Sequence, residues 1–181
     1  MATSESFGLF PHHGSGYNRA AMSQSSRSSV LFVCMGNICR SPAAEIIFRK
    51  LVDDAGLAGH IEIDSAGTIG YHRGSPPDSR MADTLRRKGY VIDGKARRIQ
   101  EEDLERFSLI VTMDEENLEH VRQLDTGGRY YEKIRPLVGF CKIHTTAERV
   151  PDPYYGGQQG FDHVIELLED GCLGILNELK K

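Results

Sequence analysis

Apolar residues are arranged in two different patterns along this chain, and the two patterns alternate from residue 30 to its end. Residues 30–33 form an unbroken apolar run, which is typical of a strand buried on both faces. Ala43, Ile46, Ile47 and Leu51 then recur at helical spacing. Strands that alternate with helices predict βαβ units, and therefore an α/β fold in which a parallel sheet lies between two layers of helices.

The same patterns place the other elements. Ser41 and Pro42 mark the start of the first helix, because Ser is a good N-cap and Pro suits the first helical position. Further strands are expected at 61–64 and 109–111, with a weaker candidate at 134–138. Further helices are expected to end at Gly89 and to cover 114–124 and 161–179, with a helical turn at 103–107.

The first 29 residues differ in composition from the rest of the chain. They hold eight Ser, several Gly, two Arg and one acidic residue, and they lack apolar periodicity. Such a segment buries too little surface to order itself, which favours a disordered tail. A targeting segment is the alternative, because organellar transit peptides are rich in Ser and poor in acidic residues. We therefore expect a tail or targeting segment at 1–29 and a single domain at 30–181.

Charge and cysteine content narrow the function classes. The formal net charge of -4 argues against a nucleic-acid-binding or anionic-membrane-binding surface. The four cysteines show neither the dense spacing of a disulfide framework nor a zinc pattern. We therefore expect free thiols, no cofactor, no metal and a cytoplasmic location. A plastid or mitochondrion is the alternative location if the tail is a transit peptide.

The residues after the first strand carry the candidate chemistry. Cys34 ends the strand and Arg40 follows after five residues, at the start of a helix. Backbone N–H groups at such a turn, with the positive end of the helix dipole, form a cradle for a dianionic phosphate. Arg40 can hold two phosphoryl oxygens with its planar fork. The same field favours the thiolate at Cys34, which predicts a nucleophile; an inert buried thiol is the alternative.

A second candidate group lies far along the chain. Asp152 sits between Pro151 and Pro153, and this rigid turn suits a general acid, which needs fixed placement. The alternative is a simple turn residue, as Asp between prolines often is. Tyr154 and Tyr155 follow it, either as walls of a pocket for an aromatic group or as packing for the loop.

These residues together resemble the low-molecular-weight protein tyrosine phosphatases. The resemblance rests on residues 30–42 and on 152–156, covers about 30–180, and includes the segments at 64–67, 95–97 and 113–118. It implies a four-stranded parallel sheet of the flavodoxin-like or Rossmann-like kind called the phosphatase I fold. It also implies metal-independent hydrolysis of protein phosphotyrosine and small aryl phosphates through a phosphocysteine, with acid phosphatase activity.

The resemblance also implies roles for individual residues. Cys34 becomes the nucleophile, Arg40 the phosphate clamp, and Asp152 the general acid that later activates water. The phosphate-binding positions are Met35, Gly36, Asn37, Ile38, Cys39 and Ser41; loop support falls to Asn37, Ser41 and Ser65; the pocket wall is formed by Tyr71, Tyr154 and Tyr155. Phosphotyrosine proteins are the implied partners, and we expect a monomer, with weak self-association as the alternative.

Three positions near this site need separate comment. By resemblance, Cys39 is a second thiol that forms a reversible disulfide with Cys34; a small apolar loop residue is the alternative. Many family members carry a His that supports the loop Asn where this chain has Gly94, so we expect looser support or a water in its place. His72 is expected near the rim of the pocket, facing solvent rather than taking part in catalysis.

Other functions on the same loop remain open. An arsenate reductase would need paired cysteines to relay electrons, and Cys141 and Cys172 show no such motif. A protein-arginine phosphatase typically has Thr at the position of Ile38, so Ile38 favours phosphotyrosine. A catalytically silent phosphate-binding module would be expected to lack Cys34, Arg40 or Asp152.

Overall fold

Four parallel strands build the sheet of the computed structural model, which describes Met1 and residues 28–154 and 156–181. The strands are β1 (Ser28–Cys34), β2 (Ile61–Gly67), β3 (Leu109–Thr112) and β4 (Ile134–Pro136), in the order β2-β1-β3-β4. The predicted α/β fold with a four-stranded parallel sheet is therefore confirmed. Most of the expected tail or targeting segment, residues 2–27, lies outside the described residues.

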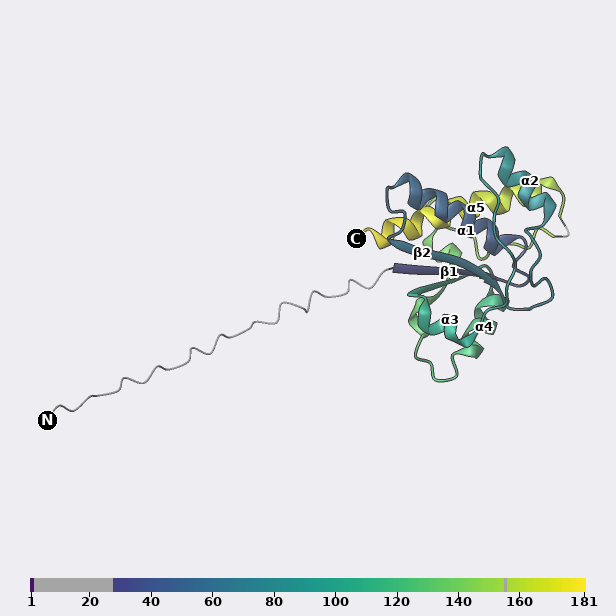
Figure 1. The fold of residues 1–181 in the computed structure, drawn as a ribbon. Coiled ribbons are helices and arrows are strands. Elements are labelled where there is room, and N and C mark those ends of the chain that lie inside the picture. Colours follow the sequence, from purple (N-terminus) through teal and green to yellow (C-terminus); the bar gives the residue numbers. More distant parts are fainter. Residues whose placement is uncertain (2–27, 155) are drawn as a thin grey trace.

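Helices cover both faces of the sheet (Figure 1). On one side lie α1 (Arg40–Asp54), α2 (Ser79–Arg87) and α5 (Gln158–Leu179). On the other side lie α3 (Glu101–Arg106) and α4 (Glu115–Leu124). Two short 3-10 helices, Tyr131–Lys133 and Leu137–Phe140, flank β4. The molecule thus has the expected three layers.

The apolar run in β1 explains why this strand lies at the centre. Val30 and Phe32 belong to a core cluster shared with α1 and α5. Leu31 and Val33 belong to the opposite cluster, shared with α3 and α4. All four side chains are fully buried, as expected because successive side chains in a strand point to opposite faces. Each contributes about 1.5–3 kcal/mol of apolar burial.

Strand β1 begins at Ser28, two residues before the expected start of the domain at residue 30. Ser29 is buried, and its hydroxyl accepts a hydrogen bond from Ser108 N at 2.8 Å. In return, Ser29 N donates to Ser108 Oγ at 2.8 Å. These partners satisfy the polar groups of Ser29, so the strand extends into a segment whose composition indicated a tail.

The predicted start of α1 is wrong by two residues. The helix begins at Arg40, with Cys39 as the N-cap residue and no side-chain cap. Ser41 lies inside the first turn, where its hydroxyl contacts Cys34, Asn37 and the carbonyl of Ala66. The hydroxyl therefore bonds to the neighbouring loop and strand, and does not cap the helix.

Smaller differences occur at other ends. Helix α3 begins at Glu101, where Gln100 and Asp103 form a capping box. Helix α5 begins at Gln158, three residues before the expected start at Phe161. Strand β4 ends at Pro136, because a 3-10 helix begins at Leu137. None of these differences changes the topology.

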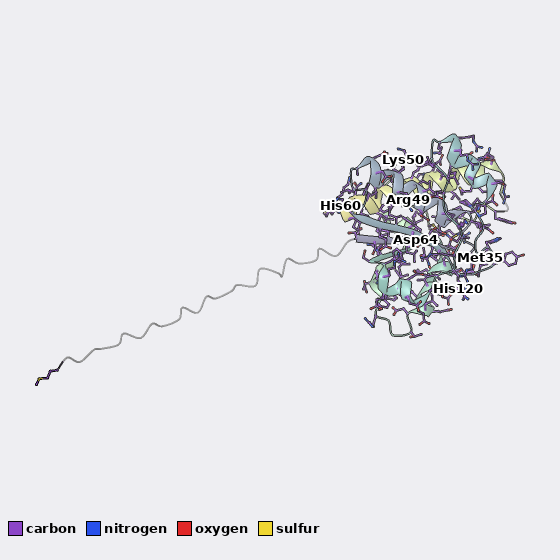
Figure 2. All side chains as sticks on the ribbon, viewed as in Figure 1. Met35, Arg49, Lys50, His60, Asp64 and His120 are labelled. Carbon is purple, nitrogen blue, oxygen red and sulfur yellow. The ribbon has the colours of Figure 1, made fainter. Side chains whose placement is uncertain are left out.

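The order of strands fixes where a ligand can bind. The connection from the carboxyl end of β1 leads to β2 on one side, whereas the connection from the carboxyl end of the neighbouring β3 leads to β4 on the other side. Ligands in open α/β sheets bind at such a point. Figure 2 shows Met35, which follows β1, on the opposite side of the molecule from His60, which precedes β2. Throughout the described residues, no helix has the length and hydropathy to span a bilayer.

Candidate active site

The loop from Cys34 to Arg40 turns its backbone carbonyls away from the hollow that it encloses. The outward bonds run from Thr68 N to Cys34 O at 2.9 Å, from Ile69 N to Met35 O at 3.1 Å, and from Asp78 N to Ile38 O at 2.8 Å. In a trans peptide the N–H points opposite to the carbonyl before it. The N–H groups of Met35, Gly36 and Cys39 therefore face the hollow, as the sequence predicted for an anion cradle.

The side chain of Asn37 ties this loop to its surroundings. Its amide nitrogen donates to Ser41 Oγ and Ser65 Oγ, each at 2.9 Å, and its carbonyl oxygen accepts from Arg97 N at 2.8 Å. The backbone of Asn37 has φ +55°, a left-handed conformation that Asn tolerates. The residues expected to support the loop are thus in direct contact.

Gly94 is the position where the resemblance is imperfect. It has φ +102°, a backbone conformation that favours glycine. Three neighbours already use both amide hydrogens and the carbonyl oxygen of Asn37. The polar groups of Asn37 are therefore satisfied although no histidine stands at position 94.

Ser41 links this network to the nucleophile candidate. Its Oγ lies 3.0 Å from Cys34 Sγ, and Cys34 is only 3% exposed. Because Ser41 Oγ accepts from Asn37, its own proton is available for the sulfur or for the carbonyl of Ala66, 3.2 Å away. A hydroxyl that donates to Cys34 would stabilise negative charge on the sulfur.

Glu45 extends the network beyond what the sequence indicated. Ser65 Oγ donates to Glu45 Oε2 at 2.7 Å. Burial raises the pKa of this carboxyl, against the opposing hydrogen bonds from Ser65 and Arg49. Glu45 lies on α1 and Ser65 on β2, so only the packing of helix on strand brings them together.

Arg40 is almost completely buried and has several partners. Its Nη1 contacts Asp114 and donates to Val150 O at 3.1 Å, while Nη2 donates to Asp152 Oδ2 at 3.3 Å. Burial opposes its charge, but Cys34, Asp114 and Asp152 together raise the pKa of its guanidinium above the ordinary value. Arg40 is therefore a fixed cation beside Cys34.

The sequence did not predict the role of Asp114 as the partner of Arg40. It was expected as the start of a helix over 114–124 and as part of the segment at 113–118, and it does cap α4, accepting from Asn117 N at 2.8 Å. Its second oxygen contacts Arg40, a residue 74 positions earlier. Asp114, which caps α4 shortly after the end of β3, thus also orients Arg40, the candidate phosphate clamp.

Asp152 reaches the same place from the loop before α5. Its Oδ1 accepts from Tyr154 N at 3.0 Å, and its Oδ2 accepts from Arg40. Its side chain is 37% exposed, so a bound substrate and water can both reach it. Cys34, Arg40 and Asp152 are therefore brought together from three separate segments.

A cavity of about 200 Å³ lies between these groups. Asn37 and Ser41 do not line it; they are buried behind the loop. Tyr155 is outside the described residues. No group of three or more His, Cys, Asp or Glu side chains in the described ranges is placed to hold a metal ion. The lining residues are Cys34, Met35, Gly36, Ile38, Cys39, Arg40, Tyr71, His72, Asp152 and Tyr154.

His72 lies at the rim of this cavity, where it was expected. Its side chain is half-buried and lines the cavity, so it faces solvent only in part. A Cβ atom added to Gly36 would lie 3.1 Å from His72 Cδ2, so the ring packs against the loop. Tyr71 meets the same ring edge to face, with centroids 5.0 Å apart, and is itself 86% exposed. The two residues form the rim.

Gly67, at the end of β2, allows the loop to lie where it does. A Cβ atom there would lie 2.7 Å from Met35 O and 3.1 Å from Asn37 N. Both contacts are to backbone, so a Gly67→Ala substitution has to displace the loop. The sequence showed this glycine only as part of the segment at 64–67.

We expect Gly67→Ala to lower kcat/KM for an aryl phosphate by about tenfold to a hundredfold, because small displacements of reacting groups are costly. Gly160→Ala is the matched control, since a Cβ at Gly160 on α5 meets nothing within 4 Å. Steady-state kinetics with thermal unfolding checks this. Wild-type turnover in Gly67→Ala would show that the loop tolerates the displacement.

Comparisons with known proteins agree with this geometry. A family profile described as low molecular weight phosphotyrosine protein phosphatase matches residues 29–181. The Synechocystis protein slr0328, named for the same family, is 48% identical over 84% of this chain and 96% of its own length. A crystal structure of a protein tyrosine phosphatase from Entamoeba histolytica is 40% identical, with a TM-score of 0.81, over 84% of this chain and 97% of its own.

A further solved structure bears on the alternative substrate. The structure of an arginine phosphatase from Drosophila is 30% identical, with a TM-score of 0.77, and covers 84% of this chain and 98% of its own. The fold is thus shared by proteins named for different phosphorylated residues. The family profile, the sequence identities and the structural similarity agree: the chain belongs to the low molecular weight phosphotyrosine protein phosphatase family, and is a hydrolase of phosphate monoesters.

Proposed function

We propose that the protein hydrolyses phosphotyrosine in proteins, and small aryl phosphates, through a phosphocysteine. Cys34 thiolate attacks phosphorus as the bond to the phenolic oxygen breaks, and Asp152 gives its proton to that oxygen. Asp152 then takes a proton from water, which attacks phosphorus and releases Cys34 and inorganic phosphate. Arg40 and the loop N–H groups hold the phosphoryl oxygens throughout.

One observation carries this proposal: a thiol, a buried guanidinium and a partly exposed carboxyl meet at one cavity. They come from the end of β1, the start of α1 and the loop before α5. The thiol contacts a hydroxyl, and the guanidinium contacts the carboxyl. This supports nucleophile, clamp and acid as the roles of Cys34, Arg40 and Asp152.

The walls of the cavity favour an aromatic phosphate ester. The lining includes apolar Ile38, which belongs to the loop itself, and aromatic Tyr154, and Met35, another lining residue, is 41% exposed. A phenyl ring buries its faces against such walls, whereas a short serine side chain would not reach past them. Phosphotyrosine is therefore the substrate class that we propose.

Phosphoarginine is the second candidate, because its planar guanidino group could also lie between apolar walls. The Drosophila relative is named for that activity, but Ile38 supports phosphotyrosine here, since arginine phosphatases typically have Thr at this position. Both reactions would use the same nucleophile and clamp. Substrate comparison is therefore needed to separate them.

The test uses three peptides of one sequence that differ only in carrying phosphotyrosine, phosphoserine or phosphoarginine. The assays contain a thiol reductant and a metal chelator. We expect the phosphotyrosine peptide to have a kcat/KM at least a hundredfold above the other two. Preference for phosphoarginine would reassign the substrate, loss of activity in chelator would overturn the metal-independent mechanism, and an inert protein would indicate a phosphate-binding module.

We propose a protective redox role for Cys39. Peroxide converts Cys34 thiolate to a sulfenic acid and releases hydroxide; Cys39 thiolate then displaces hydroxide from that sulfur and forms a disulfide. Burial, followed by the charges of Asp78, Cys34 and Asp152, raises the pKa of Cys39 to about 12. The reacting thiolate is therefore scarce at neutral pH.

The rate of disulfide formation is accordingly expected to rise about tenfold per pH unit between pH 7 and 9, because a raised thiol pKa leaves the thiolate fraction proportional to hydroxide. The measurement treats enzyme with peroxide at each pH, then with dithiothreitol, and follows recovered activity and disulfide mass. Cys39→Ser should recover less activity at every pH. Equal recovery would instead support a small apolar loop residue.

We propose that the protein acts as a monomer in a reducing compartment, in the first instance the cytoplasm. All four cysteines are free thiols in the structure. A thiol nucleophile needs such surroundings, and an organelle remains the alternative if the first residues direct transport. A fluorescent fusion of the full chain, compared with one that lacks residues 2–27, tests the compartment, and light scattering tests the assembly.

A further inference from the structure

We propose that Arg80 is a positioning residue for Asp152: it clamps the loop that carries Asp152 to the phosphate-binding loop, and so sets how well the leaving group is protonated. This inference rests on the proposed function, in which Asp152 is the general acid. It concerns a residue on α2 that the sequence did not single out.

The loop that carries Asp152 is held in part by contacts with other segments. Residues 151–154 form no helix or strand. Before Asp152, Val150 anchors the loop, since its N–H donates to Met113 O at 2.7 Å and its carbonyl accepts from Arg40. After Asp152, the backbone needs a second anchor if the carboxyl is to stay in place.

Arg80 supplies that second anchor. Its Nη1 donates to Tyr154 O at 2.8 Å. The guanidinium carbon also lies 4.9 Å from the centre of the Tyr154 ring and 5.0 Å from that of Phe161, a buried residue of α5. Stacking on aromatic faces and an N–H bond to a carbonyl are contacts that one Arg makes together, and that Lys cannot reproduce.

Asp78 connects this clamp to the phosphate-binding loop. Its carboxylate accepts from Arg80 Nε at 3.0 Å and from Arg80 Nη2 at 2.9 Å, which is bidentate pairing. Its backbone N–H donates to Ile38 O at 2.8 Å, inside the loop that follows Cys34. The hydrogen bond from Arg80 lowers the pKa of Asp78, so the pair stays ionised.

The clamp reaches the acid through one further bond. Tyr154 N donates to Asp152 Oδ1 at 3.0 Å, so a shift of the Tyr154 backbone moves the carboxyl. The other oxygen accepts from Arg40 Nη2 at 3.3 Å. The chain Ile38–Asp78–Arg80–Tyr154–Asp152 therefore fixes the separation of acid and phosphate cradle.

The experiment measures kcat/KM for a series of aryl phosphates whose leaving phenols range from strongly to weakly acidic. Arg80→Met keeps an unbranched side chain of similar length but loses the three hydrogen bonds of the guanidinium, and Arg80→Lys keeps the charge. For the most acidic phenol, which leaves without a proton, we expect both variants to stay within about threefold of wild type. For the least acidic phenol we expect at least a tenfold loss.

Three comparisons make the result decisive. Arg86→Met is the matched control, because Arg86 lies on the same helix but pairs with exposed Asp83. The slope of log kcat/KM against the pKa of the leaving phenol should be the same in this variant as in the wild type. Asp152→Ala should show the steepest dependence on phenol acidity. Adding Arg80→Met to Asp152→Ala should change nothing further. Thermal unfolding shows that each variant is folded.

The possible results distinguish the general-acid role of Asp152 from the positioning role of Arg80. If Asp152→Ala loses activity equally for all phenols, the proposed role of Asp152 fails. If Asp152→Ala is steep but Arg80→Met and Arg80→Lys keep the wild-type slope, or lose activity equally for all phenols, the positioning role of Arg80 is wrong while the general acid stands. Should Arg80→Met fail to fold, Arg80→Lys alone decides between these outcomes.

Discussion

Cys34→Ser is expected to abolish hydrolysis of aryl phosphates, with a loss on the order of 10⁴-fold or more in kcat. A serine hydroxyl does not ionise near neutral pH, and it needs a hydrogen-bonded general base to become a nucleophile. Within the described residues, Ser41 Oγ is the one side-chain hydrogen-bond partner of the Cys34 sulfur, so no imidazole is placed to remove that proton. Steady-state assays with p-nitrophenyl phosphate, in reductant and chelator, measure the loss.

The matched control for this variant is Cys141→Ser, because Cys141 is a buried thiol whose sulfur contacts Leu167 O and Asp170, and it does not line the cavity. It should retain turnover close to wild type. The Cys34→Ser protein should still bind a phosphotyrosine peptide, since Arg40 and the loop N–H groups are unchanged. Retention of several per cent of wild-type kcat in Cys34→Ser would contradict nucleophilic catalysis by this residue.

Arg40→Lys is expected to lower kcat/KM by about 10²- to 10³-fold, although the positive charge is kept. A lysine cannot hold two phosphoryl oxygens at once, and each charge-assisted bond contributes about 1.5–3 kcal/mol. The substitution also weakens the contacts to Asp114 and to Val150 O, which fix the guanidinium. We therefore also expect the free energy of unfolding to fall by about 1–3 kcal/mol.

Enzyme kinetics and chemical denaturation of the same preparation measure both effects. Arg135→Lys is the control, because Arg135 pairs with Glu178 on the surface and does not line the cavity. It should change neither quantity appreciably. Full activity in Arg40→Lys would mean that charge alone, without the planar fork, holds the phosphate.

The sequence was sufficient wherever neighbours along the chain decide the outcome. The apolar run at 30–33 predicted a strand buried on both faces, and alternating rhythms predicted a parallel sheet between helices. The short path from Cys34 to Arg40 predicted an anion cradle for the same reason, since a strand, a tight turn and a helix start are all local. Asp152 was singled out through its flanking prolines and the family resemblance.

Packing between distant segments decided the rest. Ser41 looked like a helix cap from its neighbour Pro42, yet its hydroxyl meets Cys34 and Ala66 across the loop. Asp114 lies 74 positions from the Arg40 that it orients, and Arg80 lies 74 positions from the Tyr154 that it holds. No local pattern of residue types contains such pairs, because the sheet order and the helix packing bring them together.

The chain sequence by itself therefore predicted the architecture and the candidate reacting groups that meet at one strand end. Only the tertiary structure decided how those groups are held. It showed that every polar atom of the Asn37 amide is hydrogen-bonded, that the loop backbone lies close to Gly67, and that Arg80 binds the backbone of Tyr154. The physical reason is the separation along the chain over which each effect acts. Propensity and periodicity act over a few residues, whereas the hydrogen bonds from Arg40 to Val150 O and to Asp152 join segments more than 100 residues apart.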